Sequence, residues 1–115
     1  MLVGAGTVLS VESLLAARDA GARFAFAPGF TPEVVAKARE IGMPFIPGVM
    51  TPSEIQGALA CGAKIMKFFP AQLAGGPAML RALSGPYGFY GVRFIPTGGA
   101  NPENLESWLA VDSVM

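Results

Sequence analysis

The sequence predicts an α/β fold in which short parallel strands alternate with helices, as in part of a TIM (β/α)8 barrel. Apolar runs short enough for buried strands recur along the 115 residues, and each ends at a glycine or proline turn. Helix starts lie between the runs. The turn prolines are separated by 19, 23 and 26 residues, a spacing that suits one strand plus one helix. They are Pro28, Pro47, Pro70 and Pro96.

An open doubly wound sheet has a similar local pattern and is the alternative fold. Its dinucleotide fingerprint, G-x-G-x-x-G, is incomplete here, because Gly4-Ala5-Gly6 is followed by Thr7-Val8-Leu9 without a third glycine. About five consecutive strand–helix units therefore favour the barrel.

The expected strands are the apolar runs themselves, since a strand buried on both faces of a parallel sheet reads as a continuous apolar stretch. The runs are residues 1–3 leading into Gly4-Ala5-Gly6-Thr7, then 24–27, 44–46, 65–69 and 92–95. Turns are expected directly after them, at Pro28-Gly29, Pro47-Gly48, Pro70 and Pro96.

The expected helix starts share one chemistry: a side-chain oxygen caps a free N–H, and an acidic residue follows in the first turn. The caps are Ser10, Thr31, Thr51 and Asn101, and proline follows the last three directly. Thr51 with Glu54 has the spacing of a capping box. Gly21, Gly42 and Gly62 fall where left-handed helix stops belong.

The domain is expected to be incomplete, because an eight-stranded barrel needs about 200 residues or more. We expect residues 1–115 to form a single partial barrel domain, an interior fragment of a longer protein. The chain opens inside the apparent strand Met1-Leu2-Val3, and Ser113-Val114-Met115 reads as the beginning of another strand. Both ends are expected to leave strand edges and apolar faces uncovered.

Composition limits the partners. Only 14% of residues are charged, against about 25% in ordinary globular proteins, so more of the chain is expected to be buried. Eight cationic and eight anionic residues balance without a basic run, which argues against nucleic acid or an anionic membrane and for a small substrate. A single cysteine, Cys61, and the lack of a signal-like or 18-residue apolar segment predict a cytoplasmic protein.

Lys67 is the strongest candidate for chemistry. It lies in the run Ile65-Met66-Lys67-Phe68-Phe69-Pro70-Ala71, with no acidic residue closer in sequence than Glu54 or Glu103. Apolar surroundings should lower its pKa, and a neutral amine forms Schiff bases with carbonyl substrates. Because side chains alternate along a strand, Phe69 should lie beside Lys67. The alternative is a structural lysine that extends its ammonium to water.

Thr97-Gly98-Gly99, followed by the helix start expected at Asn101-Pro102, is the second candidate. Glycines let backbone N–H groups approach a phosphate, and a helix start adds partial positive charge. Barrels place their chemistry, often including a phosphate site, at the carboxyl ends of strands. A tight turn that merely needs glycine remains the alternative.

Metal chemistry is not expected, because the chain has no histidine and its single cysteine cannot make a nitrogen or sulfur metal site. The acidic residues fall on helices or, for Asp112, before a strand, so the general acid/base is expected to be water or a residue outside the chain. Trp108 is expected to be a partly buried helix residue. No cofactor is predicted.

Six motifs in one order resemble the 2-dehydro-3-deoxy-6-phosphogluconate (KDPG) aldolase family over nearly the whole chain. They are Gly4-Ala5-Gly6-Thr7-Val8, Pro28-Gly29, Ile46-Pro47-Gly48, Thr51-Pro52-Ser53-Glu54, Lys67-Phe68-Phe69-Pro70-Ala71 and Pro96-Thr97-Gly98-Gly99. The resemblance implies a metal-independent class I lyase of the Entner-Doudoroff pathway, usually trimeric. It would cleave the phosphorylated keto-acid to pyruvate and glyceraldehyde 3-phosphate. The chain would span roughly strands 3 to 7 plus the start of strand 8.

The resemblance also implies roles for individual residues. Lys67 matches the Schiff-base lysine, Thr7 the threonine that holds the pyruvate carboxylate, and Pro28 and Phe69 the walls around the pyruvyl group. Thr97 matches a residue on the aldehyde side, and Gly98-Gly99 match part of the phosphate site. The family's catalytic glutamate and carboxylate-binding arginine would precede Met1, and its Gly-Gly-Ser phosphate turn would follow Met115. Ala27 stands where relatives often have serine.

Three alternatives stay open from the sequence. The same scaffold could act on 2-dehydro-3-deoxy-6-phosphogalactonate or on 4-hydroxy-2-oxoglutarate (KHG). A non-catalytic phosphosugar-binding barrel would use Lys67 only to pair with phosphate. The 115-residue piece by itself is expected to be inactive.

Overall fold

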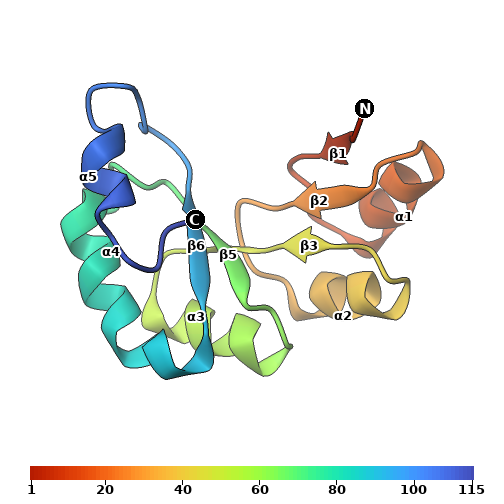
Figure 1. Cartoon of the computed structure of the whole chain (residues 1–115). Helices are drawn as coiled ribbons and strands as arrows, with labels where there is room; N and C mark the ends of the chain where they lie inside the picture. The colour runs from red at the N-terminus through yellow and green to blue at the C-terminus, as the bar shows by residue number, and fades with distance from the viewer.

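The computed structural model describes residues 1–115 as alternating strands and helices (Figure 1). In chain order the elements are β1 (Gly4–Ala5), α1 (Val11–Asp19), β2 (Phe24–Phe26), α2 (Pro32–Glu40), β3 (Phe45–Ile46), β4 (Gly48–Val49), α3 (Pro52–Ala60), β5 (Ile65–Phe68), α4 (Gly76–Ser84), the 3₁₀ helix η1 (Gly85–Tyr90), β6 (Arg93–Pro96) and α5 (Leu105–Leu109). No helix is long and apolar enough to cross a bilayer.

All strand pairs are parallel, in the orders β1-β2-β3 and β4-β5-β6. β3 and β4 belong to one extended segment, which pairs with β2 through its first half and with β5 through its second. The turn expected at Pro47-Gly48 is therefore wrong. Pro47 lacks an N–H and interrupts the ladder without reversing the chain, and its carbonyl accepts a bond from the Lys67 N–H at 2.8 Å.

The residues at both ends of the chain lie beside a neighbouring strand segment. A single parallel bridge joins Val114 to Phe94, so residues 113–115 lie beside β6, but they form no strand in the structure. At the start, the expected strand at 1–3 is displaced: the ladder begins at Gly4, and only the Val3 carbonyl is paired, with the Arg23 N–H at 2.8 Å.

Helix capping follows the sequence in the first half of the chain. Ser10 caps α1, and Thr51 and Glu54 form the predicted capping box of α3. Thr31 stands at the N-cap of α2 but makes no side-chain bond there, so its predicted capping by a side-chain oxygen is wrong. The left-handed φ angles of the predicted stops, 101° at Gly21, 68° at Gly42 and 89° at Gly62, confirm them.

The second half contains helices that the sequence patterns did not reveal. α4 and η1 follow the loop after β5, and the helix start expected at Asn101 is wrong. Asn101 and Asn104 instead exchange side-chain bonds with each other's backbone N–H, at 2.8 and 3.0 Å, and α5 begins only at Leu105. This asparagine pair satisfies the backbone of a turn before the helix.

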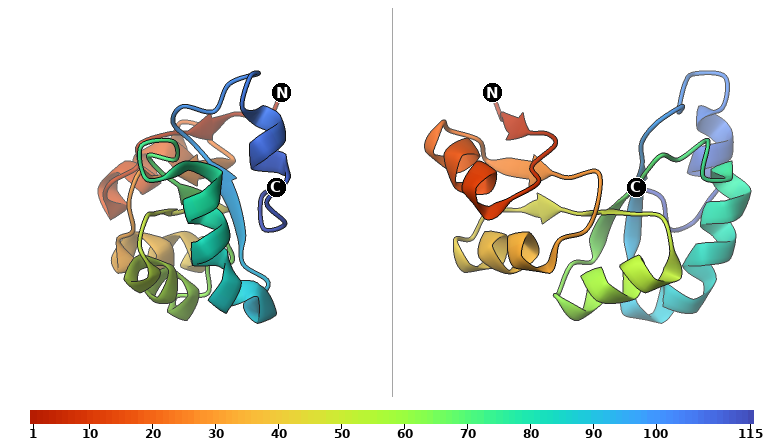
Figure 2. Two further views of the ribbon diagram at one scale, coloured as in Figure 1. Left: turned by 90° about the vertical axis from the view of Figure 1, so that its left-hand side faces the viewer. Right: turned by 180° about the vertical axis from the view of Figure 1, so that it is seen from behind.

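The core lies between the strands and the helices beside them (Figure 2). Met66 and Phe68 of β5 are fully buried against α3, α4 and α5, whereas Ile65 on the opposite face is 38% exposed. Trp108 packs at 6.5 Å from Phe68, ring centre to ring centre, and is 1% exposed, so its expected partial burial is wrong. Parallel strands with one covered face and one open face define a partial (β/α) barrel.

Candidate active site at the carboxyl edge of the strands

The predicted site residues lie where the parallel strands end. Thr7 follows β1, Pro28 follows β2, Lys67 and Phe69 stand at the end of β5, and Thr97 follows β6. Carboxyl ends of parallel strands share one edge of a sheet, and the extended β3–β4 segment joins the two sheets, so we expect these residues around one rim.

Lys67 is fixed by strands on both sides. It stands opposite Gly48 of β4 and opposite Ile95 of β6 in the parallel ladders. Its side chain is half-buried, and its Nζ lies 4.8 Å from the centre of the Phe69 ring, which confirms that the two side chains share one face. The ion pairs of the chain, Arg18–Asp19 and Lys37–Glu40, do not involve it.

Gly48 brings the turn after β2 close to Lys67. A Cβ on Gly48 would overlap the carbonyl oxygen of Pro28 and lie 2.7 Å from the Gly29 nitrogen. The Gly48 N–H donates to the Gly29 carbonyl at 3.0 Å. Pro28 can therefore approach the strand next to Lys67 only because this position lacks a side chain.

Thr7 has an unusual backbone. Its φ of 55° is the only positive value at a residue other than glycine. A β-branched residue is strained there, at a cost of about 1 to 3 kcal/mol. The N–H of the next residue, Val8, donates to the Phe26 carbonyl at 3.0 Å and holds the turn in place. Strain concentrated at a strand's carboxyl end is typical of a binding site.

The Thr97-Gly98-Gly99 turn is joined to the loop after β5. Thr97 N–H donates to the Phe68 carbonyl at 2.9 Å, and the Ala71 N–H donates to the Thr97 carbonyl at 2.9 Å. Gly98 and Gly99 have φ angles of 98° and 84°, a backbone conformation that residues with a side chain rarely adopt. A Cβ on Gly98 would lie 3.6 Å from the Phe69 ring. This turn and Lys67 thus share Phe69 as a neighbour.

One expectation about the rim is wrong. The helix-dipole contribution expected after Gly99 is wrong in its origin, because α5 begins at Leu105 and has five residues. Thr7 follows β1 of the β1-β2-β3 sheet, whereas Lys67 lies on β5 of the other sheet. The sequence patterns indicated Gly48 as part of a turn at a strand end, and they did not single out Gln72, whose Cβ lies 2.6 Å from the position of a Cβ on Gly99. A glycine directly after a proline within an apolar run was the available signal for Gly48.

Glu54 lies in the first turn of α3, directly after β4. One of its carboxylate oxygens accepts bonds from the N–H groups of Met50, at 2.7 Å, and Thr51, at 2.8 Å. The same oxygen accepts the Thr51 hydroxyl at 3.1 Å. These bonds commit Glu54 to capping α3.

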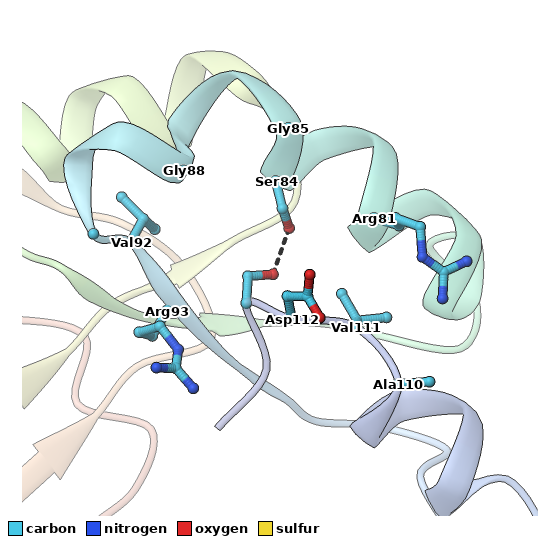
Figure 3. Close-up of a pocket in the computed structure, with 11 residues that line it drawn as sticks. Arg81, Ser84, Gly85, Gly88, Val92, Arg93, Ala110, Val111 and Asp112 are labelled. Carbon is cyan, nitrogen blue, oxygen red and sulfur yellow. Dashed lines mark hydrogen bonds between the residues drawn. The ribbon is translucent and has the colours of Figure 1, made fainter.

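A cavity of ≈ 430 Å³ lies elsewhere, between the end of α4, η1, the start of β6 and residues 110–113 (Figure 3). The hydroxyls of Ser84 and Ser113 are 2.6 Å apart within it. Arg81 and Arg93 lie on opposite sides of the cavity rather than converging (Figure 3). It adjoins the amino end of β6 and is separate from the predicted site, at the end of a barrel that serves stability.

Parallel strands alternating with helices, with a lysine at the carboxyl edge beside an aromatic ring and a glycine turn, place the chain in the class of (β/α)-barrel proteins. The family model described as "KDPG and KHG aldolase" matches residues 1–115, the whole chain. The chain belongs to the KDPG and KHG aldolase family.

Relatives agree with this assignment. The 2-dehydro-3-deoxy-phosphogluconate aldolase of Treponema pallidum (strain Nichols) is 49% identical over 100% of this chain and 54% of its own length. A crystal structure of the Legionella pneumophila KDPG aldolase, with pyruvate captured at low pH as a covalent carbinolamine intermediate, has a TM-score of 0.91. It is 44% identical and covers 98% of this chain and 54% of that one.

A third match is a cube-shaped, highly porous protein cage designed by fusing symmetric oligomeric domains. Its TM-score is 0.89 at 35% identity, over 96% of this chain and 40% of that one. The chain spans about half the length of the curated relatives it matches.

Proposed function

We propose that this chain is the lysine-bearing part of a class I aldolase that cleaves 2-dehydro-3-deoxy-6-phosphogluconate to pyruvate and glyceraldehyde 3-phosphate. The observation that carries the proposal is the position of Lys67: it stands on β5, with Nζ 4.8 Å from the Phe69 ring centre and outside both ion pairs. The covalent pyruvate carbinolamine in the Legionella relative supports it.

In the proposed reaction, the neutral amine of Lys67 attacks the C2 carbonyl of the keto-acid and forms a carbinolamine. Loss of water gives an iminium ion. A base takes the proton of the C4 hydroxyl, the C3–C4 bond breaks, and its electron pair moves into the iminium. Glyceraldehyde 3-phosphate leaves, and an enamine of pyruvate remains. Protonation of the enamine at C3, followed by hydrolysis, releases pyruvate and returns the amine.

The rim residues divide the substrate between them in this proposal. Thr7 binds the pyruvate carboxylate, and Pro28 and Phe69 enclose the pyruvyl group. Thr97 lies on the aldehyde side, while the N–H groups of Gly98 and Gly99 bind the phosphate, as successive backbone donors do in anion-binding turns. The shared contact of Phe69 with the Gly98 position supports a continuous site.

We further propose that residues 1–115 form a single partial barrel domain, roughly strands 3 to 7 plus the start of strand 8 of a longer polypeptide. The rest of that polypeptide would supply the glutamate and arginine that the resemblance implies, and the 115-residue piece by itself would be inactive. The reaction needs no cofactor or metal. The cage built from symmetric oligomeric domains supports an oligomer, which we propose to be a cytoplasmic homotrimer serving the Entner-Doudoroff pathway.

Turnover in the full-length polypeptide tests the proposal. Lys67→Met should abolish release of pyruvate from the phosphorylated keto-acid, because methionine keeps much of the volume and loses the nucleophile. Lys64→Met is the matched control: Lys64 is exposed, three residues earlier in the chain, and its removal should leave turnover unchanged. Loss of turnover with Lys64→Met and not with Lys67→Met would overturn the assignment.

The family description also names KHG, so the choice of keto-acid needs a comparison of substrates. We expect a higher kcat/KM for the 6-phosphogluconate derivative than for 4-hydroxy-2-oxoglutarate or the 6-phosphogalactonate derivative. A reversed order would reassign the substrate and keep the chemistry. Binding of the phosphosugar without any turnover would favour a non-catalytic binding barrel.

A further inference from the structure

Gln72 lies in the loop between β5 and α4, where it meets the turn after β6. We propose that Gln72 is a positioning residue that fixes the Gly98-Gly99 turn and so determines how well the site binds the phosphate-bearing half of its substrate. This inference rests on the proposed function and adds to it a residue that neither the chemistry at Lys67 nor the rim described above requires.

The backbone of Gln72 is bonded to the turn. Its N–H donates to the Gly98 carbonyl at 3.0 Å, one residue beyond the bond from Ala71 to Thr97. The ladder between β5 and β6 thus continues past the ends of both strands into the two loops. A turn held by consecutive backbone bonds presents its remaining N–H groups in a fixed direction.

The stem of the Gln72 side chain covers the other side of the turn. A Cβ placed on Gly99 would lie 2.6 Å from the Gln72 Cβ and 3.3 Å from its Cγ. Gly99, with φ of 84°, is therefore confined by Gln72 as well as by its own backbone conformation. Gln72 and Gly99 are both exposed, so removing that stem leaves this side of the turn without a neighbouring side chain to hold it.

The amide end of Gln72 extends toward α4. Its Nε2 lies 3.6 Å and its Oε1 3.8 Å from the position that a Cβ on Gly76 would occupy. The side chain therefore reaches from the Gly99 turn to the first turn of α4. Its contact with Gly99 comes from the apolar stem, which predicts that the stem matters more than the amide.

Three variants of the full-length polypeptide separate these contributions. Gln72→Gly removes the stem, and Gln72→Met keeps a stem of similar length without the amide. Leu73→Gly is the matched control, because Leu73 is the next residue of the same loop and is 91% exposed. Each variant is measured for KM with the phosphorylated keto-acid, for KM with 4-hydroxy-2-oxoglutarate, and for the rate of pyruvate trapping on Lys67 by borohydride.

Gln72→Gly should raise KM for the phosphorylated substrate about tenfold, since misplacement of a binding group by a fraction of an ångström has effects of this order. KM for the unphosphorylated substrate and the trapping rate should change less than about twofold. Gln72→Met should restore most of the lost affinity, and Leu73→Gly should behave as the parent protein.

Equal increases in KM for both substrates, or equal effects of Gln72→Gly and Leu73→Gly, would overturn the inference. Loss of trapping in Gln72→Gly alone would also overturn it, by showing that Gln72 supports the fold or the lysine instead. A parent protein that traps no pyruvate would contradict the proposed function itself, which distinguishes the two failures.

Discussion

Gly48 stands directly opposite Lys67 in the parallel ladder between β4 and β5. A side chain at Gly48 would collide with the Pro28 carbonyl. The absence of a side chain on β4 at this position therefore lets the turn after β2 lie close to Lys67. The apolar wall that we propose around the pyruvyl group therefore depends on a missing side chain as much as on Pro28 itself.

Gly48→Ala should displace the turn at Pro28 and lower the rate of pyruvate trapping on Lys67 by at least about tenfold, because the Cβ would meet backbone atoms that cannot rotate away. Gly29→Ala is the control in the same turn, since a Cβ there meets nothing within 4 Å and its φ is not positive. Equal trapping by Gly48→Ala and the parent would show that the close approach has no role.

Thr7 should reveal a conflict between stability and binding. Thr7→Gly relieves the strain of a β-branched residue at φ of 55° and should raise the free energy of unfolding by about 1 kcal/mol. The same change removes the hydroxyl proposed to bind the carboxylate, so KM should rise. Denaturant unfolding and steady-state kinetics on one sample measure both effects. A destabilised Thr7→Gly variant would contradict the strained conformation.

Trp108 tests the core that supports β5. Its indole Nε1 is buried without a hydrogen-bond partner, while its ring packs near Phe68 on the face opposite Lys67. Trp108→Phe removes the unpaired N–H, which should stabilise the fold, and part of the ring, which should destabilise it through lost packing. Trp108→Ala should cost about 3 to 5 kcal/mol, and Trp108→Phe less than about half of that.

Unfolding by urea checks this order. Trp108→Ala should also weaken turnover indirectly, because Phe68 and Lys67 are neighbours on one strand. A loss in Trp108→Phe above about half of that in Trp108→Ala would contradict an indole N–H without a partner, since removing a bonded N–H adds its own cost.

The sequence was sufficient for the features that depend on local chemistry. The run around Lys67 predicted a strand with Phe69 beside the lysine, and the capping box at Thr51 and Glu54 formed as its spacing indicated. Both depend on residues close together in the chain, where periodicity and side-chain reach determine the outcome.

The rest depends on contacts between distant segments. Nothing near Gly48 in the sequence indicates that the Pro28 carbonyl will lie against it, and nothing near Gln72 indicates the Gly99 turn. At Asn101, two asparagines competed successfully with the helix that the following proline and glutamate favoured. Local sequence signals were therefore enough to locate the strand ends. The close contacts between the loops that follow those strands became known only from the structure.

The most direct test of the account is to locate the covalent adduct. The full-length polypeptide is incubated with pyruvate and borohydride, digested, and analysed by mass spectrometry, with the Lys67→Met variant treated in parallel. A reduced pyruvyl adduct is expected on the peptide that contains Lys67, and no adduct is expected in the variant. An adduct on Lys64, or none on the parent protein, would contradict the central claim that Lys67 is the nucleophile.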